Sequence, residues 1–195
     1  FQASNPTVVH GTNGMAAALV GLTAAQTDAQ REAAQSRLIL MQALSLFVGG
    51  LPLLYMGDEW GQGNTSAQEL AVRQGPDVLE LHRPFCDNEG FAKRYEIDTT
   101  QGVIYAALRA FIQAKKDHAC LHAVEPLRLC STGNHSVLGL KRGQSVMGFF
   151  NFSGRVQAVT LGDAMTHNGT DLISGKSVDL QNLALPPYSA LWLKK

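Results

Sequence analysis

Asp58 and Glu59 are the only adjacent acidic residues in the sequence. Carboxyl groups that cleave a glycosidic bond with retention must face each other, about 5–5.5 Å apart. Neighbouring residues at the end of a strand point to opposite faces, so these two make a poor acid–nucleophile pair. The sequence instead predicts that they bond the loop backbone and fix the turn after a strand.

Arg83, between His82 and Pro84, is the strongest candidate for a contact with a substrate. A proline restricts the residue before it to extended conformations, which helps to aim the side chain. A guanidinium pairs bidentately with a carboxylate and keeps its charge when desolvated. The alternative is a solvated surface arginine. His82 is a weaker candidate for the same role.

Other residues carry less specific signals. Trp60 and Tyr55 could stack on a sugar ring or could belong to the core. The remaining histidines have no metal-ligand spacing, and the sequence predicts neither a metal site nor a cofactor. They are His10, His118, His122, His135 and His167.

A buried strand, Leu51–Met56, must position the two acids. The run is apolar without alternation, which is typical of a strand covered on both faces in a parallel α/β sheet. The pair Gly49-Gly50 before it can end a helix. Thr27 and Gln30 fit a capping box, so we expect a helix from there to about Val48.

The rest of the chain divides into a part with a long loop and a helical pattern and a part with a strand-and-turn pattern. Residues 61–97 show no clear element, and such long loops are usually functional or mobile. A helical period returns over Gln101–Asp117. After Ala123, short apolar runs alternate with turn signals, which predicts an antiparallel β-sandwich. Its expected strands are 127–130, 137–141, 146–151, 156–161, 171–173, 177–180 and 190–193. The predicted domains are therefore 1–123 and 124–195.

Composition excludes several classes of protein. The 195 residues carry 16 basic and 16 acidic side chains, so no basic excess points to nucleic acid. No apolar run reaches the roughly 18 residues of a membrane helix. The three cysteines lack metal-type spacing and indicate reduced thiols, which favours the cytoplasm. The start at Phe1, without a signal pattern, is interpreted as the tail of a longer polypeptide.

The series Gly50, Pro52, Gly57, Asp58 and Glu59 resembles the segment around the eighth barrel strand of the α-amylase superfamily. The resemblance is greatest to the amylosucrases and sucrose hydrolases. Further stretches agree in order and spacing and span nearly the whole chain. They are residues 11–22 (before barrel helix seven), 81–84 (after strand eight), 151–153 and 171–176 (strands of the C-terminal β-domain) and 185–193 (its last strand).

This resemblance implies the C-terminal part of a (β/α)8 barrel followed by a β-sandwich. The catalytic carboxylates of the family lie on earlier strands, so the chain has no catalytic residue and is expected to be inactive alone. The resemblance implies that Arg83 pairs with an upstream aspartate and closes the glucosyl pocket. The complete enzyme would transfer glucose from sucrose to an α-1,4-glucan or to water, with the upstream part of the same polypeptide as partner.

Two alternatives stay open. One is a non-catalytic carbohydrate-binding or interaction module formed by 124–195. The segment Gly50–Glu59 argues against it, because a binding module does not need a single barrel strand. The other is a different sucrose- or trehalose-acting transglucosidase. Residues 64–80 depart from the Asp- and Ser-rich loop of amylosucrases, which leaves the acceptor open.

Overall fold

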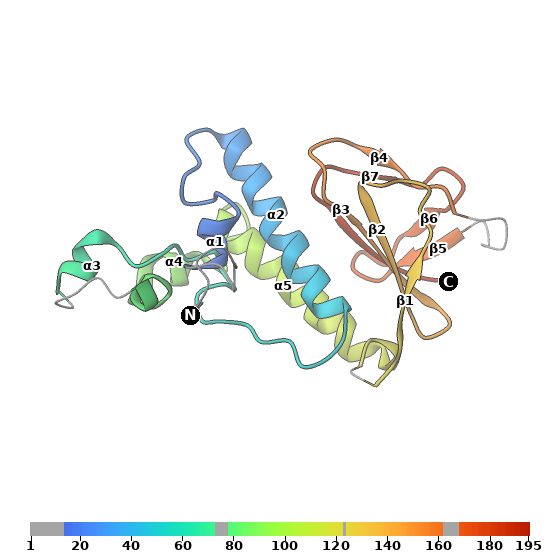
Figure 1. The fold of residues 1–195 in the computed structure, drawn as a ribbon, viewed down its shortest axis with the longest axis horizontal. Helices are drawn as coiled ribbons and strands as arrows, with labels where there is room; N and C mark the ends of the chain where they lie inside the picture. Colours follow the sequence, from blue (N-terminus) through green and yellow to red (C-terminus); the bar gives the residue numbers. More distant parts are fainter. Residues whose placement is uncertain (1–13, 73–77, 123, 162–167) are drawn as a thin grey trace, which may run out of the picture.

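The computed structural model describes residues 14–72, 78–122, 124–161 and 168–195. Five α-helices and two 3-10 turns precede eight strands in the described chain (Figure 1). The helices are α1 (Ala16–Leu19), α2 (Asp28–Phe47), α3 (Ala67–Val72), α4 (Asn88–Lys93) and α5 (Thr100–Asp117), with 3-10 turns η1 (Val78–His82) and η2 (Ala119–Leu121). The strands are β1 (Leu127–Cys130), β2 (Val137–Arg142), β3 (Val146–Asn151), β4 (Gln157–Ala158), β5 (Asn168–Asp171), β6 (Ser177–Asp179), β7 (Ala184–Leu185) and β8 (Ala190–Lys194).

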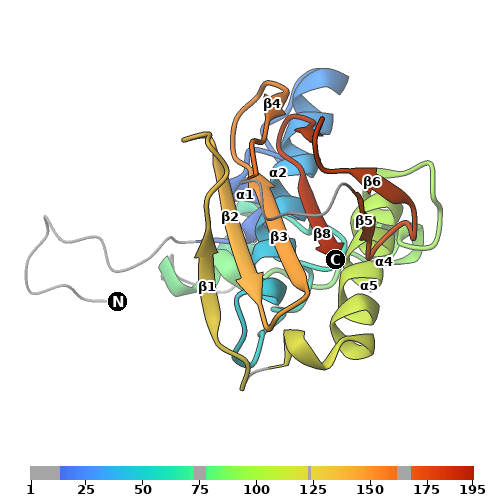
Figure 2. The same cartoon turned by 90° about the vertical axis from the view of Figure 1, so that its right-hand side faces the viewer.

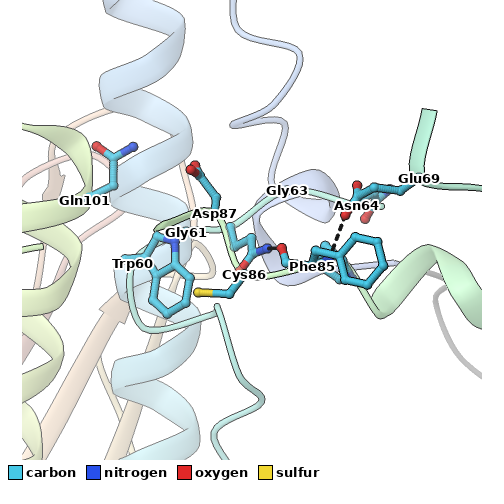
Figure 3. Close-up of a pocket in the computed structure, with 11 residues that line it drawn as sticks. Trp60, Gly61, Gly63, Asn64, Glu69, Phe85, Cys86, Asp87 and Gln101 are labelled. Atoms are coloured by element: carbon cyan, nitrogen blue, oxygen red, sulfur yellow. Dashed lines mark hydrogen bonds between the residues drawn. The ribbon is translucent and has the colours of Figure 1, made fainter. Parts of the chain in front are cut away.

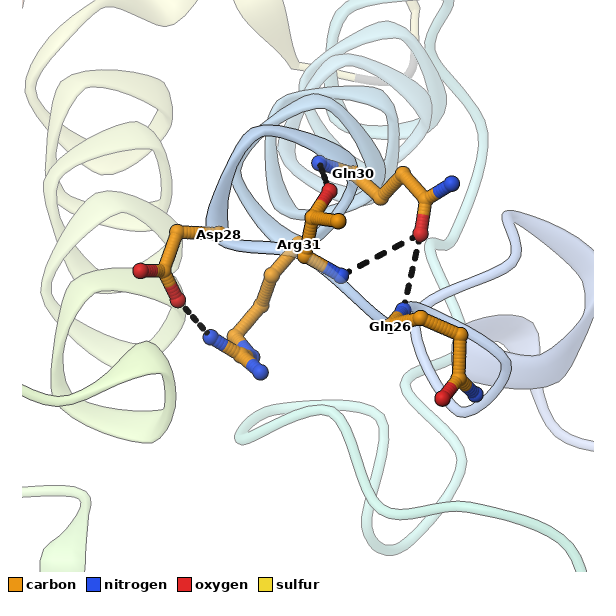
Figure 4. A network of polar contacts seen from close by, with 5 residues as sticks. Gln26, Asp28, Gln30 and Arg31 are labelled. Carbon is orange, nitrogen blue, oxygen red and sulfur yellow. Dashed lines mark hydrogen bonds and ion pairs between the residues drawn. The ribbon is translucent and has the colours of Figure 1, made fainter.

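Helix α2 begins at the predicted capping box. The Thr27 hydroxyl accepts the Gln30 N–H at 3.2 Å, and Gln30 Oε1 accepts the Thr27 N–H at 3.2 Å (Figure 4). The helix ends before Gly49 and Gly50, whose φ angles are +98° and +73°. Only glycine adopts that region without a steric penalty, so the predicted helix stop is confirmed.

The main sheet has six antiparallel strands in the order β1-β2-β3-β8-β5-β6. Strand β3 lies inside it, pairs with β2 and β8, and is buried over its whole length. Helices α2 and α5 cover one face of this sheet, as the two perpendicular views agree (Figures 1 and 2).

The core on this helical face joins the two halves of the chain. Trp192 of β8 packs against Phe47 of α2 and Phe111 of α5, with ring centroids 5.3 and 4.8 Å apart. Phe150 of β3 meets Phe47 edge-on at 5.6 Å. The predicted boundary at 123/124 stays a prediction, but a single buried cluster contains side chains from both sides of it.

The opposite face of the sheet carries a second core. Side chains of β3 and β8 alternate, so Phe149 and Leu193 point away from the helices. The two-stranded ribbon β4–β7 and nearby leucines cover them, through Val159, Leu183 and Leu185.

A buried arginine and a half-buried lysine close the helix–sheet junction at the C-terminus of α2. Arg142 is 1% exposed and donates to the carbonyls of Phe47, Cys120 and His122. Lys115 Nζ donates to the Leu46 carbonyl at 2.9 Å. Positive charge at a helix C-terminus satisfies carbonyls that lack intrahelical partners.

Three expectations need correction. Leu51–Met56 forms no strand in the described structure, because no neighbouring strand is present to pair with it. Residues 61–97 are not uniformly irregular, since they hold α3, η1 and α4. The C-terminal part is antiparallel as predicted, but the second sheet of the expected sandwich is only the two-stranded ribbon β4–β7. The described part of the chain therefore contains no barrel.

Strand prediction was otherwise close. Strands 127–130 and 146–151 are confirmed with their predicted bounds, and 137–141, 177–180 and 190–193 are confirmed within one residue. The predicted strand 171–173 is wrong, because β5 ends at Asp171 and Leu172 and Ile173 form the turn that follows it. The run 156–161 shortens to β4, and the two-residue β7 was not predicted. His10, His167 and the start of the 11–22 segment lie outside the described residues.

Candidate functional site

A tight turn follows the Leu51–Met56 run and carries the two adjacent acids. Gly57 has φ +94°, and its carbonyl accepts the Gln62 N–H at 2.9 Å. Glu59 Oε2 accepts the Gly57 N–H at 2.7 Å, and Asp58 Oδ1 accepts the Ala16 N–H at 3.4 Å. The prediction that the acids bond the loop backbone and fix this turn is confirmed for Glu59, whereas the Asp58 carboxylate bonds the first residue of α1 and so ties the turn to that helix.

Burial raises the pKa of Asp58 above its ordinary value of 3.8. The hydrogen bond from Ala16 opposes this shift, and the neighbouring Glu59 charge adds to it. The two carboxyl groups accept from different backbone N–H groups, Asp58 from Ala16 and Glu59 from Gly57. Among the described residues no group of three His, Cys, Asp or Glu side chains could hold a metal ion.

A pocket of about 500 Å³ opens beside this turn (Figure 3). Three segments converge on it: the turn after Gly57, the start of α3, and the loop between η1 and α4, with α5 at one side. Its lining is mainly polar, with one indole, that of Trp60. The lining residues are Trp60, Gly61, Gln62, Gly63, Asn64, Glu69, Pro84, Phe85, Cys86, Asp87 and Gln101.

Side-chain hydrogen bonds hold the pocket walls together. Gln62 Nε2 donates to the Phe85 carbonyl at 2.5 Å, and Glu69 Oε1 accepts the Phe85 N–H at 2.7 Å. Asn64 Oδ1 accepts the Met15 N–H at 2.7 Å, which ties the wall to the start of α1. The amide and carboxylate groups on these walls can donate to and accept from hydroxyls of a bound ligand.

Buried Thr65 anchors the turn η1, which leads to Arg83. The Thr65 N–H donates to the Leu81 carbonyl at 3.0 Å, and its hydroxyl bonds the Glu80 carbonyl. Arg83 Nη1 pairs with Glu80 Oε1 at 3.1 Å, and 53% of the arginine side chain is exposed. Arg83 itself does not line the pocket, whereas the next residue, Pro84, does.

His82 lies edge-on to Tyr55, with ring centroids 6.0 Å apart. The structure thus brings His82 beside the apolar run and leaves Arg83 at the molecular surface. Trp60 is 5% exposed and meets Phe91 of α4 at 5.2 Å, so it belongs to the core while it also borders the pocket.

The sequence did not single out Gln62, Asn64 or Asp87. Gln62 and Asn64 contact segments far apart in the chain, Gln62 with Phe85 and Asn64 with Met15. Two local signals were available. Asp87 caps α4 by accepting the Gly90 N–H at 3.1 Å, and Ser66 and Glu69 form a capping box at the start of α3, with bonds of 2.7 and 3.2 Å.

No family model matches the sequence. Solved structures do share its fold. AmyP E221Q in complex with maltotriose aligns with a TM-score of 0.69 at 15% identity, over 93% of this chain and 39% of that one. The trehalulose synthase MutB from Pseudomonas mesoacidophila MX-45 aligns at 0.59 and 19%, over 82% and 38%. A maltooligosyl trehalose synthase aligns at 0.60 and 13%, over 85% and 22%.

The chain therefore shares its fold with a part of each of these three proteins. The chain spans less than two-fifths of the length of each of these structures. No helix of the described chain is long and apolar enough to cross a membrane.

Proposed function

We propose that this chain is the C-terminal part of a retaining, sucrose-acting glucosyltransferase or hydrolase similar to amylosucrase. The complete enzyme would pass glucose from sucrose to an α-1,4-glucan or to water. Its catalytic carboxylates would lie upstream of Phe1, so the 195-residue chain would be inactive alone. This segment would contribute one barrel strand, the pocket beside it and Arg83.

One observation carries the proposal: the exposure of the apolar run. Leu51 is 95% exposed and Leu53 86%, although the sequence is that of a buried strand. Leu54, the next residue along the chain, packs onto the core shared by the helices and the sheet. The run is thus held to the core through Leu54 and leaves the apolar side chains of Leu51 and Leu53 uncovered. This arrangement suits a strand whose partner strands belong to another part of the polypeptide.

Arg83 would exchange its partner in the complete enzyme. Its bond to Glu80 joins side chains three residues apart and is partly exposed, and such surface pairs contribute little. An upstream aspartate in a desolvated pocket would bind the guanidinium more strongly. His82 would then lie at the edge of the same pocket.

Sucrose turnover by a polypeptide extended upstream of Phe1 tests the proposal. Fructose release from sucrose is expected, and cleavage of maltotriose without action on sucrose would overturn the sucrose assignment. In the extended protein, Arg83→Ala should lower kcat/KM for sucrose at least 30-fold, roughly the effect of leaving a buried charge unpaired. Arg155→Ala, at an exposed arginine of the β-domain, is the matched control.

The second candidate is a free-standing binding module formed by 124–195. The shared core argues against it. Without α2 and α5, the fully buried rings of Trp192 and Phe150 would lose the apolar side chains that cover them.

A further inference from the structure

A ladder of aromatic and arginine side chains lies on the outer surface of α4 and α5. We call Phe91, Arg94, Tyr95, Tyr105 and Arg109 the aromatic–arginine ladder. The Arg94 guanidinium stacks over Phe91 at 3.3 Å and over Tyr95 at 4.1 Å from the ring centroids. Tyr95 meets Tyr105 at 5.6 Å and 90°, and Arg109 lies 5.8 Å from the Tyr105 ring.

The Tyr95 ring is fixed and yet open. Arg94 Nη2 donates to its hydroxyl oxygen at 2.8 Å, while the same guanidinium stacks on the ring. Despite these contacts Tyr95 is 64% exposed. A ring that is already ordered loses little conformational entropy when a ligand binds, so it is preorganised for stacking.

We propose that the aromatic–arginine ladder is a binding surface for an α-glucan chain, separate from the pocket beside Gly57. Exposed ring faces carry negative quadrupole charge and attract the polarised C–H groups on the face of a glucose ring. Arg109 and the Tyr95 hydroxyl supply hydrogen-bonding groups for the sugar hydroxyls. The choice of an α-glucan over other saccharides rests on the proposed function.

Charge and size argue against other ligands. Glu89, Glu96 and Asp98 balance Arg94, Arg109 and Lys93, and Glu89 is paired with Lys93 at 2.5 Å, so the surface has no excess of positive charge for the phosphates of a nucleic acid. A stable protein interface uses roughly 20–30 residues a side, far more than these five residues within a charged border. A neutral sugar chain with apolar ring faces needs no excess of positive charge and can bind to a surface of only five residues.

The ladder also connects to the pocket. Phe91 contacts Arg94 on the surface and Trp60 in the pocket wall, with the Phe91 and Trp60 ring centroids 5.2 Å apart. A glucan held on the ladder would therefore be kept close to the pocket, which would raise the local concentration of chain ends there.

Native affinity electrophoresis of the 195-residue chain in gels containing amylopectin tests this inference. Retardation by amylopectin is expected, and Tyr95→Ala should weaken it about tenfold, as for an anchoring aromatic residue. Tyr95→Phe, which keeps the ring, should remain retarded. Phe152→Ala removes an aromatic side chain that is 47% exposed outside the ladder and should have no effect.

Several results would overturn the inference. They are the absence of retardation, equal loss in Tyr95→Ala and Phe152→Ala, or retardation only in gels of a soluble β-glucan. A change of oligomeric state in Tyr95→Ala, measured by sedimentation, would make the ladder a self-association surface instead. Because the assay involves no catalysis, its failure would leave sucrose turnover, and with it the proposed function, intact.

Discussion

Arg142 illustrates how a single residue connects the two halves of the chain. Its guanidinium is almost fully buried, and it donates to backbone carbonyls of α2, of η2 and of the residue after η2. No carboxylate is among these partners. The Phe47 carbonyl lies in the last turn of α2, where carbonyls lack intrahelical donors, whereas the His122 carbonyl also accepts the Glu125 N–H at 3.3 Å. Gly49 allows the approach, because a Cβ there would lie 2.2 Å from Arg142 Nη1.

We predict that Arg142→Ala lowers the free energy of unfolding by about 3 kcal/mol, because several buried carbonyls lose their donor. Arg155→Ala, at an exposed position, should change it by less than about 0.5 kcal/mol. Urea unfolding monitored by the fluorescence of Trp60 and Trp192 measures both. Equal midpoints for the two variants would show that the carbonyls find other donors.

Asp58 gives a prediction for pH. Its pKa is raised in the folded state by burial, so folding favours the protonated form. Stability from this group is present below its ordinary pKa of 3.8 and is lost as pH rises through the folded value. Asp58→Asn should therefore gain stability relative to the unmodified chain as pH rises above that range. Paired unfolding curves from pH 3 to 7 measure the difference, and a difference of opposite sign would contradict the burial argument.

At the scale of elements, the sequence predicted those helices and strands whose ends are determined by residues close together in the chain. The capping box of α2 and the turn-bounded strand β3 were found because their signals lie within a few residues of each other. The pocket was not found, because its walls come from segments joined by tertiary hydrogen bonds. The prediction of a strand over Leu51–Met56 was wrong for this chain. A strand forms only when it pairs with another strand, and the sequence of the run itself does not reveal whether such a partner is present.

The exposed Leu51–Met56 run should make the isolated chain self-associate, because an open apolar edge pairs with other chains. Leu51→Lys with Leu53→Lys should shift the chain toward monomer without loss of stability, since both side chains are largely exposed. Val156→Lys, at a position 66% exposed in the β-domain, is the matched control. Sedimentation velocity measures the change, and a monomeric unmodified chain would refute the expectation.

At the scale of the molecule, two cores on the two faces of one sheet organise the C-terminal half. The helices α2 and α5 belong to the first core and extend away from the sheet toward α1 and α4 (Figure 1). The sheet and its two helices thus form a base, and the apolar run Leu51–Met56 and the pocket beside Gly57 are attached to it. We infer that this base positions both features against the upstream part of the polypeptide.

Amide hydrogen exchange over residues 51–56 tests this account most directly. We predict fast exchange in the monomeric Leu51→Lys/Leu53→Lys chain, where the run has no strand partner. In a polypeptide extended upstream of Phe1, with the natural leucines, the same amides should be strongly protected by pairing with neighbouring strands. Equally fast exchange in the extended polypeptide, or strong protection in the monomer, would contradict the account.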